Sequence, residues 1–270
     1  MTSYTQSKNK TEANNMSLIK NEIPILEFDT DSTAVINPTH EKIDLKLPRK
    51  CVFAFLGEYI SEYASRSGAV KVSEFLSMTK CYPIYVLKYK GEAITLCEAP
   101  VGSAASAQIL DWLIGYGVRE IISAGSCGAL EHFPESTFLV PKKALRDEGT
   151  SYHYAPPSRF MEICESARKA IKETVTEHKM KYMEVTTWST DGFFRETKEK
   201  VAYRKSEGCS VVEMECAALA AVAQFRGATF GMILYTADSL ADVDKYDERN
   251  WGGNAYEYAL TLCLDAVHKI

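Results

Sequence analysis

The chain has 270 residues, of which 46% are hydrophobic and 25% are charged, a composition typical of a globular protein with a sizeable core. Its 31 lysines and arginines against 36 aspartates and glutamates give a formal net charge of −5, and no run of basic residues suggests nucleic acid or an anionic membrane as a partner. No apolar run reaches the roughly 18 to 20 residues that a membrane span needs.

The N-terminal part of the chain lacks a regular hydrophobic pattern. Residues 1–20 are polar and without periodicity, which favours a disordered or loosely attached tail. Residues 21–50 form an N-terminal extension in which three prolines interrupt any long element. We expect a single domain over residues 51–270.

Strand and helix patterns then alternate along the domain. The first half predicts strands over 51–57, 82–89, 93–100, 120–125 and 137–145, a turn at 90–91, and helices over 58–66 and 103–116. The second half predicts helices over 158–178, 195–206, 215–225 and 252–268, and strands over 182–190, 209–214 and 229–237. Ser158 is a possible N-cap of the first of these helices. This alternation is typical of an α/β protein with a mostly parallel or mixed sheet and helices on both faces.

Unusual residues follow the predicted strands at their carboxyl ends, where α/β proteins form their sites. They are Gly57, the segment AGSCGAL at 124–130, TWSTDGFF at 187–194, VEME at 212–215 and TADSL at 236–240. Together, these five segments predict a single pocket at the carboxyl ends of the strands.

Gly125 and Gly128 bracket Ser126 in the second of these segments. Backbone N–H groups and a hydroxyl can converge there on an anion or a sugar oxygen. A tight turn that needs glycine at positive φ explains the pattern equally well.

Glu213 and Glu215 stand where two apolar runs meet. Burial of an unpaired carboxylate costs several kcal/mol, so each acid needs a partner or a function. One of them can accept hydrogen bonds from a vicinal diol while Met214 packs on the apolar face of a sugar. The alternative for Glu215 is an acid favoured by the dipole at a helix start.

Asp238 follows a strongly apolar strand, where a dry environment would raise its pKa and suit it to act as a general acid. The alternative is a loop aspartate that caps the next turn, alone or with Ser239. The eight cysteines are scattered without the spacing of a zinc site, so we expect reduced thiols in the cytoplasm and no bound metal. Cys127 is more typical of a small packing residue than of a nucleophile.

Five segments taken together resemble the nucleoside phosphorylase/nucleosidase superfamily, and the resemblance covers roughly residues 35–268 in order. These segments are GSCGAL, RDEGTSYHY at 146–154, TDGFF, VVEMECAAL and TADSL. The resemblance implies an α/β fold with a central twisted mixed sheet flanked by helices. It also implies cleavage of a nucleoside N-glycosidic bond, with phosphate as co-substrate and no cofactor.

The resemblance further implies roles for individual residues. Glu215 would hold the ribose 2′ and 3′ hydroxyls, with Met214 packed on the sugar and Glu213 in support. Phe193 would stack on the base, and Asp238 would donate a proton to a purine ring nitrogen. Ser126 would contact the nucleophile, and His40 is the nearest match to a histidine that reaches a neighbouring subunit's nucleoside.

This sequence departs from the family where phosphate binds. Gly57 is present in the first loop, but Ser61 and Ser123 stand where phosphorylases carry two arginines. Lys80 falls near the position of a third, which a neighbouring subunit donates. The nucleosidases lack these arginines and activate water with a glutamate, whose position Glu62 occupies. After Phe193, the uridine-specific glutamine and arginine are absent and the sequence offers Arg195 and Glu196.

Three functions therefore stay open. The first is a phosphorylase that converts a purine or pyrimidine nucleoside to free base and ribose 1-phosphate, with Gly57, Ser126 and Lys80 at the phosphate. The second is a nucleosidase in which Glu62 activates water, and the third is a non-catalytic nucleoside-binding protein. We favour the first because RDEGTSYHY and STDGFF look most like the phosphorylases, and we expect a homo-oligomer, from dimer to hexamer.

Overall fold

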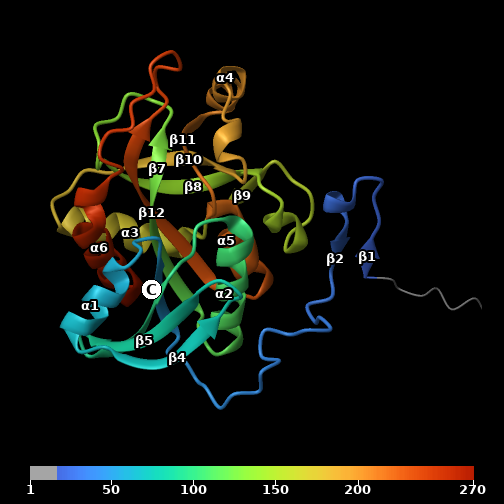
Figure 1. The fold of residues 1–270 in the computed structure, drawn as a ribbon, viewed down its shortest axis with the longest axis vertical. Helices are drawn as coiled ribbons and strands as arrows, with labels where there is room; N and C mark the ends of the chain where they lie inside the picture. Colours follow the sequence, from blue (N-terminus) through green and yellow to red (C-terminus); the bar gives the residue numbers. More distant parts are fainter. Residues whose placement is uncertain (1–16) are drawn as a thin grey trace, which may run out of the picture.

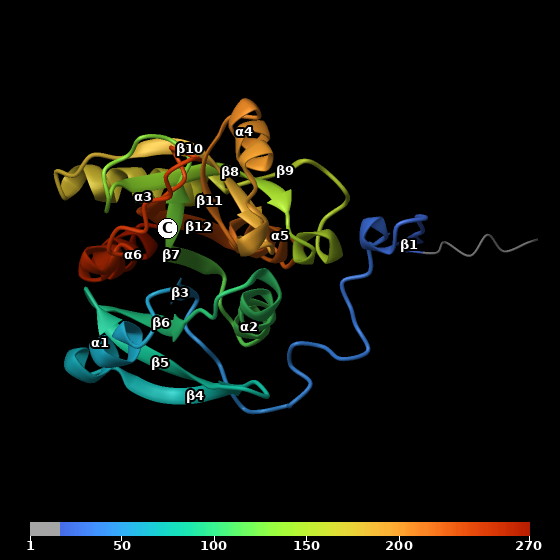
Figure 2. The same cartoon turned by 45° about the horizontal axis from the view of Figure 1, so that its top comes forward.

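The computed structural model describes residues 17–270, so most of the tail expected over 1–20 lies outside the described residues. Its centre is a ten-stranded mixed β-sheet with helices on both faces, which confirms the predicted fold class (Figures 1 and 2). The extension carries the 3-10 helix η1 (Pro24–Leu26) and β2 (Phe28–Asp29). At the end of the predicted tail, Leu18 and Ile19 form the short strand β1, which pairs with β2, so these two residues are ordered against the expectation. In both views this part of the chain lies on the outside of the domain, where η1 and β2 contact the 3-10 helix η2 (Thr150–His153).

The strand order of the large sheet is β11-β10-β8-β12-β7-β3-β6-β5-β4, with β9 beside β8. The strands are β3 (Lys50–Ala54), β4 (Val70–Leu76), β5 (Cys81–Tyr89), β6 (Glu92–Glu98), β7 (Glu120–Ala129), β8 (Phe138–Asp147), β9 (Phe160–Glu162), β10 (Met183–Thr190), β11 (Cys209–Glu213) and β12 (Thr229–Ser239). Because β11 also pairs with the end of β7, the strands β7, β12, β8, β10 and β11 close into a ring.

Two helical layers cover the sheet. Helices α1 (Tyr59–Ser67), α3 (Glu165–Glu177) and α6 (Tyr256–His268) lie on one face, and α2 (Ser103–Gly115) and α5 (Cys216–Phe225) lie on the other. Helix α4 (Lys198–Ser206) packs near β11 at the edge. Every residue of α5 up to Ala223 is buried, which its alanine-rich sequence permits because small side chains allow close approach to α2 and the sheet.

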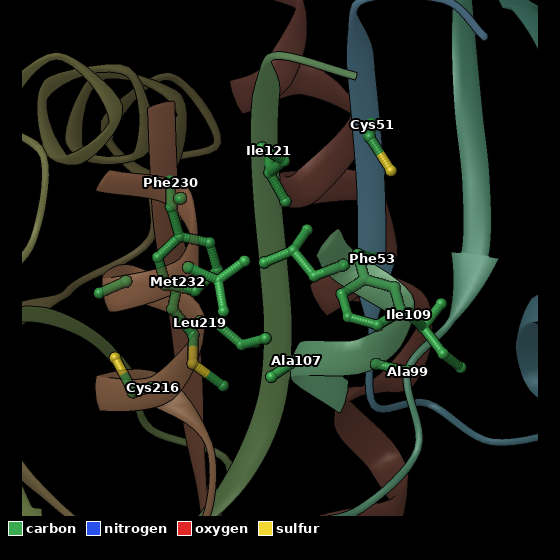
Figure 3. Packing of buried hydrophobic residues seen from close by; sticks show 14 of the residues in the cluster. Cys51, Phe53, Ala99, Ala107, Ile109, Ile121, Cys216, Leu219, Phe230 and Met232 are labelled. Atoms are coloured by element: carbon green, nitrogen blue, oxygen red, sulfur yellow. The ribbon is translucent and has the colours of Figure 1, made fainter. Parts of the chain in front are cut away.

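One hydrophobic cluster joins α2 and α5 to the sheet. Figure 3 shows Ala107 and Ile109 of α2 and Leu219 of α5 facing strand residues such as Phe53, Ile121 and Met232. Burial of each such large side chain stabilises the fold by about 1.5–3 kcal/mol. The cluster fixes α2 and α5 against the sheet.

The helix predicted over 158–178 begins only at Glu165, so the prediction that Ser158 caps it is wrong. Residues 160–162 instead form β9, which pairs with β8, and the Ser158 hydroxyl accepts a hydrogen bond from Arg146. Strand β4 was not predicted. Within the described residues, no helix is long and apolar enough to cross a membrane.

Candidate active site

A cavity of about 160 Å³ opens at the carboxyl ends of the central strands. Its walls come from residues 125–128 of β7, residues 212–215 at the end of β11, and Asp238 of β12. Phe193 and Glu196, which follow β10, and Trp251, which precedes α6, complete most of the lining. Four of the five segments that the sequence analysis singled out therefore meet here, and Phe55 lines the cavity in place of Gly57.

The closure of the ring brings two of these segments into contact. Val212 of β11 pairs with Gly128 of β7 in antiparallel register. A Cβ atom at Gly128 would lie 2.9 Å from Leu240 Cδ1, 3.0 Å from Val212 Cγ1 and 3.3 Å from Asp238 Oδ1. The space around Gly128 favours glycine because a larger residue would displace these side chains, and the alternative of a positive-φ turn is wrong because β7 continues through Ala129.

Glu213 is buried and fully engaged by the protein. Its Oε1 accepts hydrogen bonds from Ser189 Oγ (2.5 Å) and Thr187 Oγ1 (3.1 Å), and its Oε2 accepts from the backbone N–H groups of Glu215 and Cys216 (2.7 Å each). These last two N–H groups belong to the first turn of α5, which would otherwise lack partners for them. Glu213 therefore fixes the junction between β11 and α5.

Glu215 is also buried but has fewer protein partners. Its Oε1 accepts a hydrogen bond of 2.5 Å from the backbone N–H of Gly102, and the Ser103 hydroxyl donates to the Met214 carbonyl (2.5 Å). Burial and the nearby charge of Glu213 raise the pKa of Glu215 to about 8. A carboxylate held in this way at a cavity wall is suited to accept hydrogen bonds from a polar ligand.

Two more carboxyl groups, those of Asp238 and Glu196, line the cavity. Asp238 is buried, and burial raises its pKa, although the Tyr246 hydroxyl opposes the shift. Burial and the charge of Asp238 raise the pKa of the half-buried Glu196 to about 7. A raised pKa favours the protonated form of a carboxyl group and so suits it to act as a general acid.

The segment around Ser126 presents small groups to the cavity. Ser126 is exposed, and its neighbour Cys127 is buried with Sγ donating to the Tyr235 carbonyl at 3.5 Å. Burial raises the pKa of the Cys127 thiol well above its usual range, so this group stays protonated and packs as a neutral side chain. Gly57 follows β3, has a φ of +55°, and would leave open space around an added Cβ.

Five of the predicted site residues do not line this cavity: Gly57, Glu62, Arg195, Lys80 and His40. Glu62 is exposed on α1, and Arg195 is exposed at the end of the 3-10 helix η3 (Phe193–Arg195). Lys80 forms an ion pair with Glu98 (2.6 Å) in the β4–β5 turn. His40 lies on the N-terminal extension and lines a different cavity, of about 810 Å³, between that extension and α2 and α5.

The two serines at the expected arginine positions bond within the protein. The Ser123 hydroxyl is buried and donates to the Phe53 carbonyl (2.5 Å), and Ser61 Oγ accepts from the Tyr85 hydroxyl (3.3 Å). Neither arginine has a replacement among the cavity-lining residues, which include no lysine or arginine.

Sequence reasoning missed Gly102, Val101 and Trp251 at the site. Gly102 has a φ of +100°, a conformation that L residues rarely adopt, and its N–H holds Glu215. The Pro-Val-Gly-Ser run before α2 is a signal that could have revealed a constrained helix start. Within residues 17–270, no group of three or more His, Cys, Asp or Glu side chains is arranged to hold a metal ion.

Known structures share this fold. An AMP nucleosidase from Bacteroides thetaiotaomicron is 25% identical and aligns with a TM-score of 0.67 over 85% of this chain and 91% of its own. A uridine phosphorylase from Vibrio fischeri has a TM-score of 0.72 over 83% of this chain and 93% of its own, at 21% identity. The second likeness concerns the fold alone.

Sequence comparison also finds a phosphorylase. A guanosine phosphorylase from Halorubrum lacusprofundi is 26% identical over 162 residues, which are 60% of this chain and 67% of that protein. The family profile described as "Phosphorylase superfamily" matches residues 49–266. This chain therefore belongs to the phosphorylase superfamily.

Proposed function

We propose that this protein is a nucleoside phosphorylase that cleaves the N-glycosidic bond of a nucleoside with phosphate, releasing free base and ribose 1-phosphate. The arrangement of Glu215 carries this proposal. Its buried carboxylate is fixed by the Gly102 N–H at one wall of the cavity, and the acid Asp238 lies at another. The 2′ and 3′ hydroxyls of a ribose would donate to Glu215, and Met214 would pack on the sugar.

The charges of the cavity suit the reaction. As the bond from C1′ to the base breaks, its electron pair leaves with the base and positive charge develops on the ribose. In its ionised form, Glu215 would stabilise that positive charge. Asp238, whose pKa is raised, would give its proton to a ring nitrogen of the departing base, while a phosphate oxygen forms the new bond to C1′.

Phosphate would lie beside Ser126, where the hydroxyl and the backbone of β7 offer donors next to the loop that begins at Gly57. The parallel strands β3 and β7 are neighbours, which brings these two loops to the same edge of the sheet. Lys80 would add a positive charge from a neighbouring subunit. Relatives named as guanosine, uridine and purine nucleoside phosphorylases support phosphorolysis.

We further propose that the base is a 6-oxopurine. Glu196 and Asp238 both line the base side of the cavity, beside Phe193. With a pKa of about 7, Glu196 is ionised in part of the molecules near neutral pH. With Asp238 at one ring nitrogen, the ionised form of Glu196 would accept a hydrogen bond from the N1–H of guanine or hypoxanthine. Adenine presents an acceptor at N1 and would be disfavoured. The relative named guanosine phosphorylase supports this choice.

Hydrolysis is a second candidate, and the charge of the cavity favours it. Four carboxyl groups and no lysine or arginine line the described cavity, an environment that disfavours a phosphate dianion. Water carries no charge and meets no such penalty. Glu62 lies on the exposed side of α1, so activation of water by this residue would require a movement of α1 or a contribution from a neighbouring subunit.

The two candidates are separated by incubating the purified protein with guanosine, inosine, adenosine or uridine, with and without phosphate. We expect free guanine and hypoxanthine only when phosphate is present, each with an equal amount of ribose 1-phosphate. Base released without phosphate supports hydrolysis, and loss of that release in Glu62→Gln would assign the water-activating role. Tight binding without any product would contradict both candidates.

Glu215→Gln tests the ribose assignment. The amide keeps the size of the side chain but loses the charge, so we expect kcat/KM to fall about 100-fold or more. Glu257→Gln makes the same exchange at an exposed position of α6 and should leave kcat/KM unchanged. Equal rates in Glu215→Gln and wild-type protein would remove Glu215 from the reaction.

A further inference from the structure

Trp251 differs from the other two tryptophans of the chain. Trp112 and Trp188 are 3% and 0% exposed, whereas Trp251 is 48% exposed and lines the cavity. Phe193, 42% exposed, lines the same cavity from a different element. Two large aromatic rings thus leave apolar surface uncovered at the cavity, and burial of such surface is favourable.

The backbone around Trp251 is held in an unusual conformation. Arg249 and Trp251 have φ angles of 49° and 52°, and Gly252 has 69°. Residues other than glycine adopt positive φ at a cost of roughly 1 kcal/mol or more each. The surrounding contacts must therefore maintain this conformation.

Those contacts come mainly from Glu135. Its Oε1 accepts hydrogen bonds from the backbone N–H groups of Asn250 and Gly252, both at 3.0 Å, which are the residues on either side of Trp251. The Arg249 guanidinium donates to the Phe133 carbonyl at 2.8 Å. A single carboxylate therefore clamps the backbone at the point that carries the indole ring.

Strand β12 limits the loop from the other side. A Cβ atom at residue 252 would lie 2.8 Å from the Tyr235 ring, so only glycine lets the loop approach β12 this closely. The same strand carries Asp238. The position of Trp251 is consequently coupled to the strand that provides the proposed acid.

We propose that Trp251 is a base-binding residue, which forms with Phe193 an aromatic clamp for the heterocycle of the nucleoside. The inference rests on the proposed function and adds a residue to it. Stacking of a base on an aromatic side chain contributes about 1–3 kcal/mol. A purine offers a larger face than a pyrimidine, so the clamp selects two-ring bases. Glu135 is a positioning residue that acts through Trp251.

Binding is measured with hypoxanthine, the product base, which undergoes no reaction at the site. Intrinsic fluorescence of the wild-type protein should be quenched during the titration, because Trp251 is the exposed tryptophan. In Trp251→Phe the quench should disappear while affinity falls less than about fivefold. In Trp251→Ala the Kd should rise about 5- to 150-fold, the equivalent of 1–3 kcal/mol.

Two controls keep the outcomes distinct. Tyr258→Ala removes an aromatic ring of similar exposure on α6, outside the cavity, and should leave Kd unchanged. Glu135→Ala should raise KM for inosine in the wild-type Trp251 background and have no further effect in Trp251→Ala. A positioning role predicts this lack of additivity, whereas a purely structural role predicts additive losses.

Two results would overturn separate claims. If wild-type protein binds hypoxanthine and Trp251→Ala binds it equally tightly, the clamp is refuted while the proposed function stands. If wild-type protein binds neither bases nor nucleosides, the proposed function itself fails. Thermal melting of each variant shows whether a loss reflects binding or unfolding.

Discussion

Glu213 and Glu215 are two residues apart but occupy different chemical environments. Glu213 accepts four hydrogen bonds from the protein, two of them from the start of α5. Glu215 accepts a hydrogen bond from the Gly102 N–H and lines the cavity beside Met214. The first carboxylate supports the backbone that carries the second. This division explains why both acids occur in an otherwise apolar stretch.

The raised pKa of Glu215 has a consequence for stability. A carboxyl whose pKa rises from its ordinary value of 4.5 to about 8 on folding holds its proton more tightly in the folded state. Its contribution to stability is therefore fully present below pH 4.5 and is lost as the pH rises toward 8. The slope in this window is about 1.4 kcal/mol for each pH unit.

Glu215→Gln should remove this slope, because the amide has no proton to lose and can still accept from Gly102. We expect the melting temperature of the variant to exceed that of wild-type protein increasingly between pH 5 and pH 8. Differential scanning calorimetry at several pH values measures the difference. A constant gap between the two proteins across this range would contradict the raised pKa.

At the level of single residues, the sequence predicted Glu215, Met214, Asp238 and Phe193 near one pocket, because each follows an apolar strand. It could not predict Trp251, whose position depends on the distant Glu135 and on a loop without periodicity. For Gly125 and Gly128 it left two explanations open, a ligand-binding segment and a positive-φ turn, and the turn is wrong. Their small size serves the packing of β7 against β11 and β12, which sequence alone does not reveal.

At the level of elements, the site depends on a junction at which the N-terminus of α2 contacts the segment that leads into α5. The N-terminus of α2 holds the loop before α5 through Gly102 and Ser103, which bond Glu215 and Met214. Helices α2 and α5 also pack together in the core, so their relative position is fixed. Most helices and strands were predictable from periodicity, whereas β9 was not, since three residues carry too little pattern.

Gly102→Ala tests this junction. At a φ of +100° alanine is strained, so we expect a loss of about 1–3 kcal/mol in stability and a displaced N–H at Glu215. Gly68→Ala is the matched control, with a φ of +72° at the end of α1 and open space around the added Cβ. Both variants should lose stability in urea, but only Gly102→Ala should lose kcat/KM, by about tenfold or more. Equal activity losses in the two variants would show that the junction has no special role.

At the scale of the whole molecule, the N-terminal extension is attached to the domain by polar contacts and by the buried side chain of Leu47, which belongs to the hydrophobic core. Arg226 donates to the Ser32 carbonyl at 2.6 Å, and Trp112 Nε1 donates to Glu41 at 3.0 Å. Between the extension and the domain lies the cavity of about 810 Å³ that His40 lines. The sequence alone does not indicate this arrangement, because it depends on contacts between residues that are far apart in the chain.

Apolar side chains near this cavity remain exposed to solvent. Ile36 on the extension is 71% exposed, and Leu76 and Met78 at the β4–β5 turn are 66% and 101% exposed. The same turn carries Lys80, which the proposed phosphate site requires from a neighbouring subunit. Burial of such surface contributes about 25 cal/mol for each Å². We therefore propose that these surfaces meet in a homo-oligomer.

Light scattering coupled to size-exclusion chromatography tests the assembly. Wild-type protein should elute at a multiple of 30.2 kDa. The double variant Ile36→Lys with Met78→Lys places charges on the apolar surface, so it should shift toward 30.2 kDa and lose activity, because the site would lack its neighbour's contribution. Tyr258→Lys on α6, which is 59% exposed, should keep the wild-type mass. A fully active wild-type particle of 30.2 kDa would show that one chain builds the whole site alone.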